Sequence, residues 1–110
     1  MQYHFPFENQ IEKYLGDMIL YTQEIDQTQS IAWIDIDGTH GEIKNIGADR
    51  TYLIIKWQGL FVIEGKEIPV DEKDIVYIPK GTTYNITWTF SYVLVNMPAF
   101  TNEQDIWTNQ

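Results

Sequence analysis

The hydrophobic and polar positions of this chain form short runs with a period of two, and the pattern is clearest between Gly59 and Tyr84. Successive side chains of an extended segment point to opposite faces, so a period of two is typical of β-strands. The turn signals Glu64-Gly65 and Asp71-Glu72-Lys73 separate the runs in this region. The pattern therefore predicts two strands joined by a tight hairpin and a third strand that ends at the Pro79-Lys80-Gly81 turn.

The same reading extends to most of the chain and predicts an all-β domain. Residues 1–16 are expected to form a lead-in segment, with a helical turn or irregular structure, and residues 17–110 a single domain. Short strands with regular turn signals indicate a sandwich or barrel, because both architectures protect strand edges. Strands are predicted at about 17–22, 30–36, 41–45, 51–56, 59–63, 66–70, 74–78, 84–89 and 92–96.

Composition narrows the class of protein. A chain of 110 residues has room for one domain, and its 15% aromatic content suits sheets that pack face to face. The formal net charge of −9 argues against nucleic acid as a partner, because phosphate attraction needs basic surface. The absence of cysteine excludes thiol chemistry and disulfides. No leader and no apolar run of about 18 residues is present, so the sequence predicts a cytoplasmic protein without membrane contact.

The segment from Gly38 to Phe100 resembles the cupins, a family of small jelly-roll β-barrels. The resemblance rests on the Gly38 position, on the run DIVYIPKGT that ends a strand, and on the hairpin that precedes it. It implies a double-stranded β-helix, that is, a jelly-roll barrel. Small cupins commonly dimerise, so the resemblance also implies a homodimer.

The metal ligands of the cupin motifs are absent from this sequence. The first motif has two histidines and a glutamate, and their positions fall on Lys44, Ile46 and Arg50. The second motif has a histidine, whose position falls on Tyr84. A divalent ion needs imidazole and carboxylate donors, and two cationic side chains would repel it. The sequence therefore predicts no metal and no cofactor.

Two histidines are present elsewhere, His4 and His40. Neither belongs to a His-x-His or His-Glu-x-x-His motif, and both fall in predicted lead-in or loop regions. The sequence therefore predicts that both histidines lie on the surface.

The residues that replace the metal ligands suggest a different kind of site. If alternation holds, the side chains of 44, 46, 50, 52 and 54 share one inner face, and those of 84, 86 and 88 share another. This arrangement predicts a small polar or anionic ligand inside the barrel, with Arg50 able to hold a carboxylate or phosphate through two nitrogens. The alternatives are a rim ion pair for Arg50, a solvated Lys44, and a core role for the aromatic residues. The predicted ligand-binding residues are Lys44, Arg50, Tyr52, Tyr84 and Trp88.

Two functions remain open from the sequence. The first is a metal-free cupin that binds a small metabolite, as sensors and accessory proteins of carbohydrate metabolism do. The second is a metal-independent isomerase or epimerase of sugars or sugar nucleotides, with Tyr84 and Lys44 as acid and base. In that case Tyr84 would have a lowered pKa beside Arg50 or Lys44. A structural protein whose cavity is filled by its own aromatic side chains is a third reading.

Overall fold

The computed structural model describes residues 2–108. Within this range the chain is almost entirely extended, and no helix is long and apolar enough to cross a membrane. Two single-turn 3-10 helices accompany the strands: η1 (Phe7–Asn9) and η2 (Asn102–Gln104). The strands are β1 (Ile11–Leu15), β2 (Met18–Asp26), β3 (Gln29–Thr39), β4 (Ile43–Asn45), β5 (Asp49–Lys56), β6 (Gly59–Ile63), β7 (Lys66–Val70), β8 (Ile75–Ile78), β9 (Thr83–Met97) and β10 (Asp105–Trp107).

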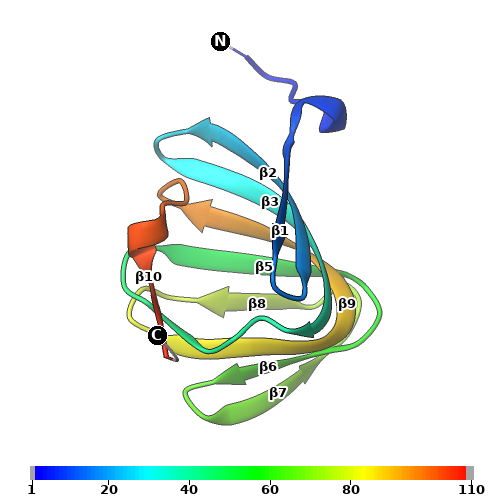
Figure 1. The fold of residues 1–110 in the computed structure, drawn as a ribbon, viewed down its shortest axis with the longest axis vertical. Coiled ribbons are helices and arrows are strands. Elements are labelled where there is room, and N and C mark those ends of the chain that lie inside the picture. Colours follow the sequence, from blue (N-terminus) through cyan, green and yellow to red (C-terminus); the bar gives the residue numbers. More distant parts are fainter. Residues whose placement is uncertain (1, 109–110) are drawn as a thin grey trace.

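The strands form one curled antiparallel sheet that wraps around the core (Figure 1). The 15-residue strand β9 is its centre, because β9 pairs with β3, β4, β5 and β6. Its first part lies against β6, and its last part lies between β3 and β5. The outer strands β8 and β7 extend the sheet from β5 and β6. This arrangement is the jelly-roll barrel predicted from the sequence.

Most predicted strands are confirmed, and three differences have physical causes. The predicted bounds of β6 and β7 agree with the structure because the Glu64-Gly65 turn sets their register, with both residues at positive φ. The predicted strands 84–89 and 92–96 are one continuous strand, β9. The lead-in contains a strand, since β1 pairs with β2 over residues 11–15. The C-terminal strand β10, which pairs with β4, was not predicted.

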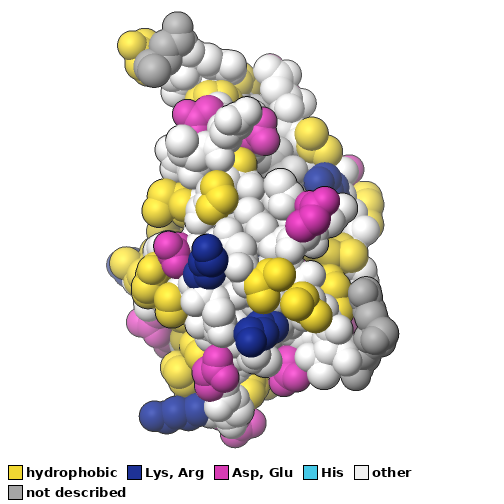
Figure 2. Space-filling view, turned by 90° about the vertical axis from the view of Figure 1, so that its left-hand side faces the viewer, with side chains coloured by type: hydrophobic (Ala, Val, Ile, Leu, Met, Phe, Trp, Pro, Cys, Tyr) yellow, Lys and Arg dark blue, Asp and Glu magenta, His cyan; other side chains and the backbone are white. Residues whose placement is uncertain are grey.

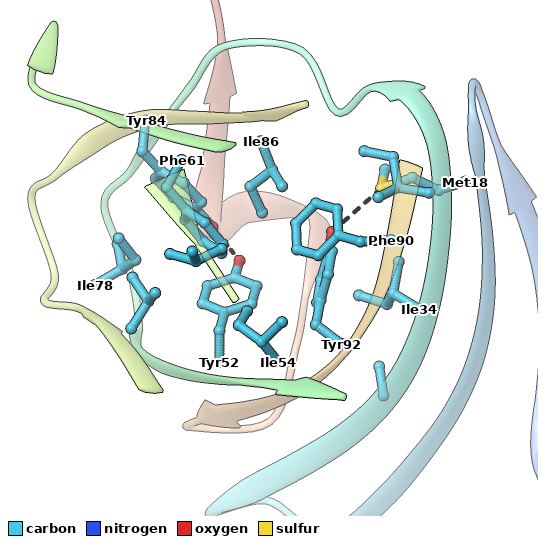
Figure 3. Close-up of a cluster of buried hydrophobic side chains, with 14 of the residues drawn as sticks. Met18, Ile34, Tyr52, Ile54, Phe61, Ile78, Tyr84, Ile86, Phe90 and Tyr92 are labelled. Carbon is cyan, nitrogen blue, oxygen red and sulfur yellow. Dashed lines mark hydrogen bonds between the residues drawn. The ribbon is translucent and has the colours of Figure 1, made fainter. Parts of the chain in front are cut away.

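Alternation places the core on the inner face of the sheet (Figure 3). Phe61 of β6, Phe90 and Tyr92 of β9, and Tyr52 of β5 contact one another edge to face or at tilted angles, which aromatic rings favour. The backbone of Gly59 lies against the Phe90 ring, and a Cβ there would approach the ring to 2.3 Å. The aromatic cluster therefore fills the barrel interior between β5, β6 and β9.

Candidate functional site

A cavity of about 700 Å³ opens beside the aromatic cluster. Strands β1, β2 and β3 form one side, β5 and β9 form the floor, and the segment after β9 forms the opposite side. A volume of this size is in the range of pockets that hold small molecules. The polar side chains that line it include His40, Arg50, Tyr52, Asn96 and Asp105.

Arg50 on β5 is the most buried charged residue near the cavity, with 2% of its side chain exposed. Its Nε donates a 2.6 Å hydrogen bond to Asn96 Oδ1, and its Nη1 donates a 2.9 Å bond to the Tyr84 hydroxyl. Nη1 also lies 2.8 Å from Asp105 Oδ1 in an ion pair that is not a well-aligned hydrogen bond. Nη2 has no hydrogen-bond partner within residues 2–108. The guanidinium is therefore held from three sides and has one donor nitrogen left.

This network changes the protonation behaviour of its members. Burial alone would lower the pKa of Arg50, but Tyr84, Tyr52 and Asp105 outweigh burial and raise it, so the guanidinium stays charged. Burial raises the pKa of Tyr84 even though Arg50 opposes the shift, and burial raises that of Tyr52 strongly. The lowered pKa expected for Tyr84 is therefore wrong, because desolvation of a buried phenolate outweighs the neighbouring cation. Both tyrosines are neutral at pH 7.

The two tyrosine hydroxyls lie 2.6 Å apart, and one donates to the other (Figure 3). Arg50 Nη1 can only donate, so the Tyr84 oxygen accepts from it. Tyr52 lines the cavity, whereas Tyr84 lies behind it. The pair therefore connects the buried guanidinium to a hydroxyl that a ligand can reach.

His40 follows β3 and lies at the cavity wall. Its ring stacks on Tyr84 and on Trp107, with centroids 6.0 and 5.3 Å away. Nδ1 lies 2.7 Å from the Gly41 carbonyl oxygen, which only accepts, so Nδ1 carries the proton of the neutral ring. Burial lowers the pKa of His40, and Arg50 adds to this effect while Gly41 and Asp105 oppose it. At neutral pH the ring is therefore uncharged, with an unprotonated Nε2.

The segment after β9 completes the site. It carries Asp105 and Trp107 on β10, and Phe100, whose ring centroid lies 6.0 Å from the Arg50 guanidinium carbon. Gln104 anchors the segment, since its Oε1 accepts a 2.8 Å bond from Asn96 Nδ2 and its Nε2 donates to the Ala99 carbonyl. Trp107 is partly buried and packs against the core.

The structure brings together three of the five predicted ligand-binding residues. Arg50, Tyr52 and Tyr84 are buried neighbours, as alternation along β5 and β9 predicts. Lys44 and Ile46 are exposed instead, because β4 turns Ile43 and Asn45 inward. Trp88 is 46% exposed, since its φ of 89° interrupts the alternation of β9 at that residue. The inward positions predicted for Lys44, Ile46 and Trp88 are therefore wrong.

The two-point grip expected of Arg50 finds no free pair of donor nitrogens in the structure. Asn96 takes Nε, and Tyr84 and Asp105 share Nη1, so only Nη2 is left for a carboxylate or phosphate. A forked contact needs two free donors on one edge of the guanidinium. Arg50 thus organises the site from behind and offers a ligand one donor nitrogen, Nη2.

Three residues of the site, His40, Asn96 and Asp105, were not predicted from the sequence. The surface placement of His40 is wrong, and a signal for it existed: Ala32, Ile34 and Ile36 point inward, and the same parity leads through Gly38 to His40. Asn96 follows the inward positions of β9 in the same way. Asp105 had no such signal, because a β10 strand of three residues shows no period of its own.

The donor set does not fit the metal centre common among cupins. Within residues 2–108 no three His, Cys, Asp or Glu side chains group closely enough to hold an ion. The cavity has one imidazole, and its Asp105 carboxylate is already paired with Arg50. A divalent ion at this position would face a fixed guanidinium. These residues are suited to hydrogen bonding and proton transfer.

Known proteins resemble this chain in structure but not closely in sequence. No family model and no curated protein matches it. Among solved structures, Pac13, described as a unique nucleoside dehydratase, superposes with a TM-score of 0.90 at 19% identity, covering 98% of this chain and 92% of Pac13. Three variants of Streptomyces Pac13 with uridine, one His→Gln and two Tyr→Phe, each superpose with a TM-score of 0.91 at 18–19% identity.

A more distant likeness points to the same architecture. Oxalate decarboxylase from Bacillus subtilis superposes with a TM-score of 0.81 at 14% identity, over 94% of this chain and 31% of that one. Identities this low show the fold and nothing of the reaction. The curled sheet centred on β9, the paired strands and these superpositions agree that this chain has the jelly-roll fold found in cupins.

Proposed function

We propose that this protein binds an uncharged, polyhydroxylated small molecule of the nucleoside class in the cavity, and that His40 moves a proton on it without a metal. The observation that carries the proposal is the neutral imidazole at the cavity wall, with Nδ1 committed to Gly41 and Nε2 unprotonated. A base of this kind needs an accessible lone pair and a pKa not far from the working pH. Tyr52 on the same cavity adds a hydroxyl donor.

The charges of the cavity favour a neutral ligand. Lys13 and Arg50 are its cationic side chains, and Glu24 and Asp105 its anionic ones, so the lining is balanced. Arg50 is already paired with Asp105 inside the protein. A phosphate would lose its hydration without gaining a free cation from Arg50, and desolvating an unpaired charge is costly. Hydroxyl and carbonyl groups can bond to Tyr52 and to Arg50 Nη2 at no such cost.

The structural comparisons add support from an independent direction. Pac13 structures exist with uridine and with single substitutions of a histidine or of a tyrosine. This chain places one histidine and two tyrosines within one buried network. The shared fold and the shared residue types suggest a related ligand and a related proton transfer.

Dehydration is a reaction that this arrangement can perform. His40 Nε2 would take a proton from a carbon next to a carbonyl or similar activating group, and the C–O bond to the neighbouring hydroxyl would break. The imidazolium would return its proton to the leaving oxygen, which departs as water and leaves a carbon–carbon double bond. Tyr52 would hold the substrate by a hydrogen bond and remain neutral, as its raised pKa requires.

The isomerase alternative named Tyr84 and Lys44 as acid and base. Lys44 is exposed on β4, and Tyr84 lies behind the cavity lining with a raised pKa. The geometry supports His40 as the proton-transfer group in place of both residues, with Tyr52 as a hydrogen-bond donor to the ligand.

The experiment combines binding and turnover. Calorimetric titration should show binding of uridine and weaker binding of uridine 5′-monophosphate, and mass spectrometry of a panel of nucleosides and their 5′-oxidised forms should show loss of water. His40→Gln should retain uridine binding and lose turnover, while Ile106→Gln, an exposed change outside the cavity, should retain both. Binding without turnover or solvent-deuterium uptake would reduce the protein to a binding module. Absence of any nucleoside binding would contradict the proposal.

A further inference from the structure

The cavity changes from polar to apolar along one inward row of the sheet. The register places Tyr52 of β5 beside Leu94 of β9, and Leu94 beside Ala32 of β3. Ala32 in turn lies beside Thr22 of β2, and all four residues line the cavity. Neighbouring strands lie about 4.8 Å apart, so this row is about 14 Å long. The row begins at the Tyr52 hydroxyl and is apolar at Leu94 and Ala32.

The polar end of the row suits the sugar of a nucleoside. His40, the Tyr52 hydroxyl and Arg50 Nη2 lie at this end, and each can form a hydrogen bond with a hydroxyl or carbonyl group. A sugar over Leu94 and Ala32 would leave its hydroxyls without partners, and burying an unpaired hydroxyl is costly. The base of the same molecule is therefore expected to extend from the polar end toward β2.

Phe100 lies on the side of the cavity opposite this row. Its side chain is 44% exposed, and its ring centroid lies 6.0 Å from the Arg50 guanidinium carbon. Its backbone N–H donates a 3.0 Å hydrogen bond to Ser30 Oγ, two positions before Ala32 on β3. Phe100 thus offers an aromatic ring to the cavity beside the point where the row becomes apolar.

The segment that carries Phe100 is fixed to the barrel. The Ala99 N–H donates a 3.2 Å bond to the Gln27 carbonyl. The Gln104 side chain accepts a 2.8 Å bond from Asn96 Nδ2 and donates a 3.0 Å bond to the Ala99 carbonyl. A wall that is ordered before binding loses less conformational entropy when a ligand arrives. The Phe100 ring is therefore held in place for stacking.

Asn102, at the start of η2, supplies a polar group next to this ring. It lines the cavity two residues after Phe100. Its side-chain amide forms no hydrogen bond with any residue between 2 and 108, so its donor and acceptor are both available. The pairing edge of a nucleobase has a donor next to an acceptor, which an amide can match.

We propose that Phe100 and Asn102 form the nucleobase subsite of the cavity. The base stacks on the Phe100 ring, between that ring and the apolar row at Leu94 and Ala32, and its edge bonds to the Asn102 amide. A base suits this place because its faces stack on aromatic side chains and its polar atoms lie at its edge. The inference rests on the proposed function, since it takes a nucleoside as the ligand.

The surface around this segment is compatible with a neutral base. Figure 2 shows the side of the molecule on which η2 and β10 lie in Figure 1. Basic, acidic and hydrophobic side chains are interspersed there, and no charge of one sign dominates. An ionic ring would find no field of one sign to attract it, whereas a neutral base needs none.

The first test compares ligands with and without a base. In titrations followed by NMR, the wild type should bind uridine about tenfold or more tightly than methyl β-D-ribofuranoside, which keeps the sugar and lacks the base. Phe100→Leu should lose most of this advantage and keep its affinity for the riboside. Phe100→Tyr, which retains the ring, and Ile106→Gln, an exposed change outside the cavity, should behave like the wild type. Circular dichroism checks that each variant folds.

The second test addresses the edge of the base. In 3-methyluridine the ring N–H between the two carbonyls is replaced, so it cannot donate to Asn102. The wild type should bind it about fivefold more weakly than uridine. Asn102→Ala should bind the two nucleosides equally. A wild type that binds both equally, or an Asn102→Ala chain that still discriminates, would overturn the role of Asn102.

The outcomes separate this inference from the proposed function. Equal affinities of the wild type for uridine and the riboside, or unchanged uridine binding in Phe100→Leu, would overturn the subsite and leave the proposed function in place. Equal losses in Phe100→Leu and Phe100→Tyr would overturn stacking, because the second variant keeps an aromatic ring. A wild type that binds no nucleoside would contradict the proposed function and the subsite together.

Discussion

The barrel interior has two regions built by the same two strands, and they differ in kind. Toward β6, Phe61, Phe90 and Ile86 close the space with apolar contacts. Toward β10, Arg50 and Asn96 replace such residues, and a cavity remains. The inward parity of β5 and β9 is the same in both regions. Position along a strand, and not orientation, therefore decides whether an inward side chain becomes core or site.

A small barrel can hold a charged group inside when neighbouring side chains satisfy it. The apolar region supplies stability through burial, and Tyr52 lies at the boundary, touching Phe61 with its ring and Tyr84 with its hydroxyl. In the polar region, Asn96 and Tyr84 accept hydrogen bonds from Arg50, and Asp105 balances its charge. Little net charge is therefore left for a ligand to neutralise. The difference between the two regions can be tested by removing one group at a time.

The largest effect is expected in the apolar region. Phe61→Ala should lower the free energy of unfolding by about 3–5 kcal/mol, because the ring is fully buried and its removal leaves a cavity among the aromatic residues. Urea denaturation measures the loss. Uridine affinity of the folded variant should stay close to wild type, and Phe61→Leu should cost less. A large loss of affinity in Phe61→Leu would mean that the two regions are not separable.

A smaller loss is expected when the ion pair is broken. Asp105→Ala should lower the free energy of unfolding by about 3 kcal/mol, because Arg50 is then a buried cation without its carboxylate. The double variant Arg50→Met/Asp105→Leu should recover most of this loss, since neither charge remains. Urea denaturation of the wild type, Arg50→Met, Asp105→Leu and the double variant, treated as a double-mutant cycle, gives the coupling between the residues. A near-zero coupling would show that the pair contributes nothing.

Substitutions of Tyr84 and Tyr52 should affect the free energy of unfolding and the affinity for uridine to different degrees. Tyr84→Phe should cost about 1–2 kcal/mol, because Arg50 Nη1 loses a buried hydrogen-bond acceptor. Tyr52→Phe should cost less stability and weaken uridine binding more, since the Tyr52 hydroxyl faces the cavity. Thermal unfolding and calorimetric titration of both variants make the comparison. Equal effects of the two substitutions on uridine binding would place Tyr84 in contact with the ligand.

The smallest effect concerns pH. Burial lowers the pKa of His40 below its ordinary value near 6.5, so between the folded-state pKa and 6.5 the unfolded chain holds more protons. Stability from this group is therefore complete above pH 6.5 and falls as the pH decreases through that window. Urea denaturation at several pH values should show this slope in the wild type and lack it in His40→Gln. The same slope in both proteins would assign it to other groups.

The sequence predicted the parts of the site that obey local alternation. Arg50, Tyr52 and Tyr84 were placed inward because each shares the parity of apolar neighbours on its own strand. The inward position predicted for Lys44 was wrong because the loop 46–48 changes the parity of inward positions between β4 and β5. Asn45 points inward instead, and its side-chain oxygen accepts hydrogen bonds from Gly47 and Ala48. The prediction for Trp88 failed because the left-handed backbone of this residue turns its side chain outward, although Ile86 and Phe90 on either side keep the inward parity.

The remaining parts depend on contacts between distant segments. Asp105 meets Arg50 through the pairing of β10 with β4, and the hydrogen-bonded Gln104 and Asn96 lie on opposite sides of a loop. Such contacts leave no local period in the sequence. His40 had a usable pattern, but its position beyond the end of β3 suggested a loop at the surface.

Arg50 and Asp105 form an ion pair but lie far apart in the sequence, so the ribosome synthesises the two charges at different times. A ribosome releases β5 and its guanidinium long before it releases β10, and β9 with Asn96 and Tyr84 comes in between. Until the last strand docks, the nascent barrel contains a cation whose counter-charge has not yet been synthesised. Strand β10 thus supplies the carboxylate for a cation that precedes it in the chain, and without β10 Arg50 would be a buried cation without its counter-charge.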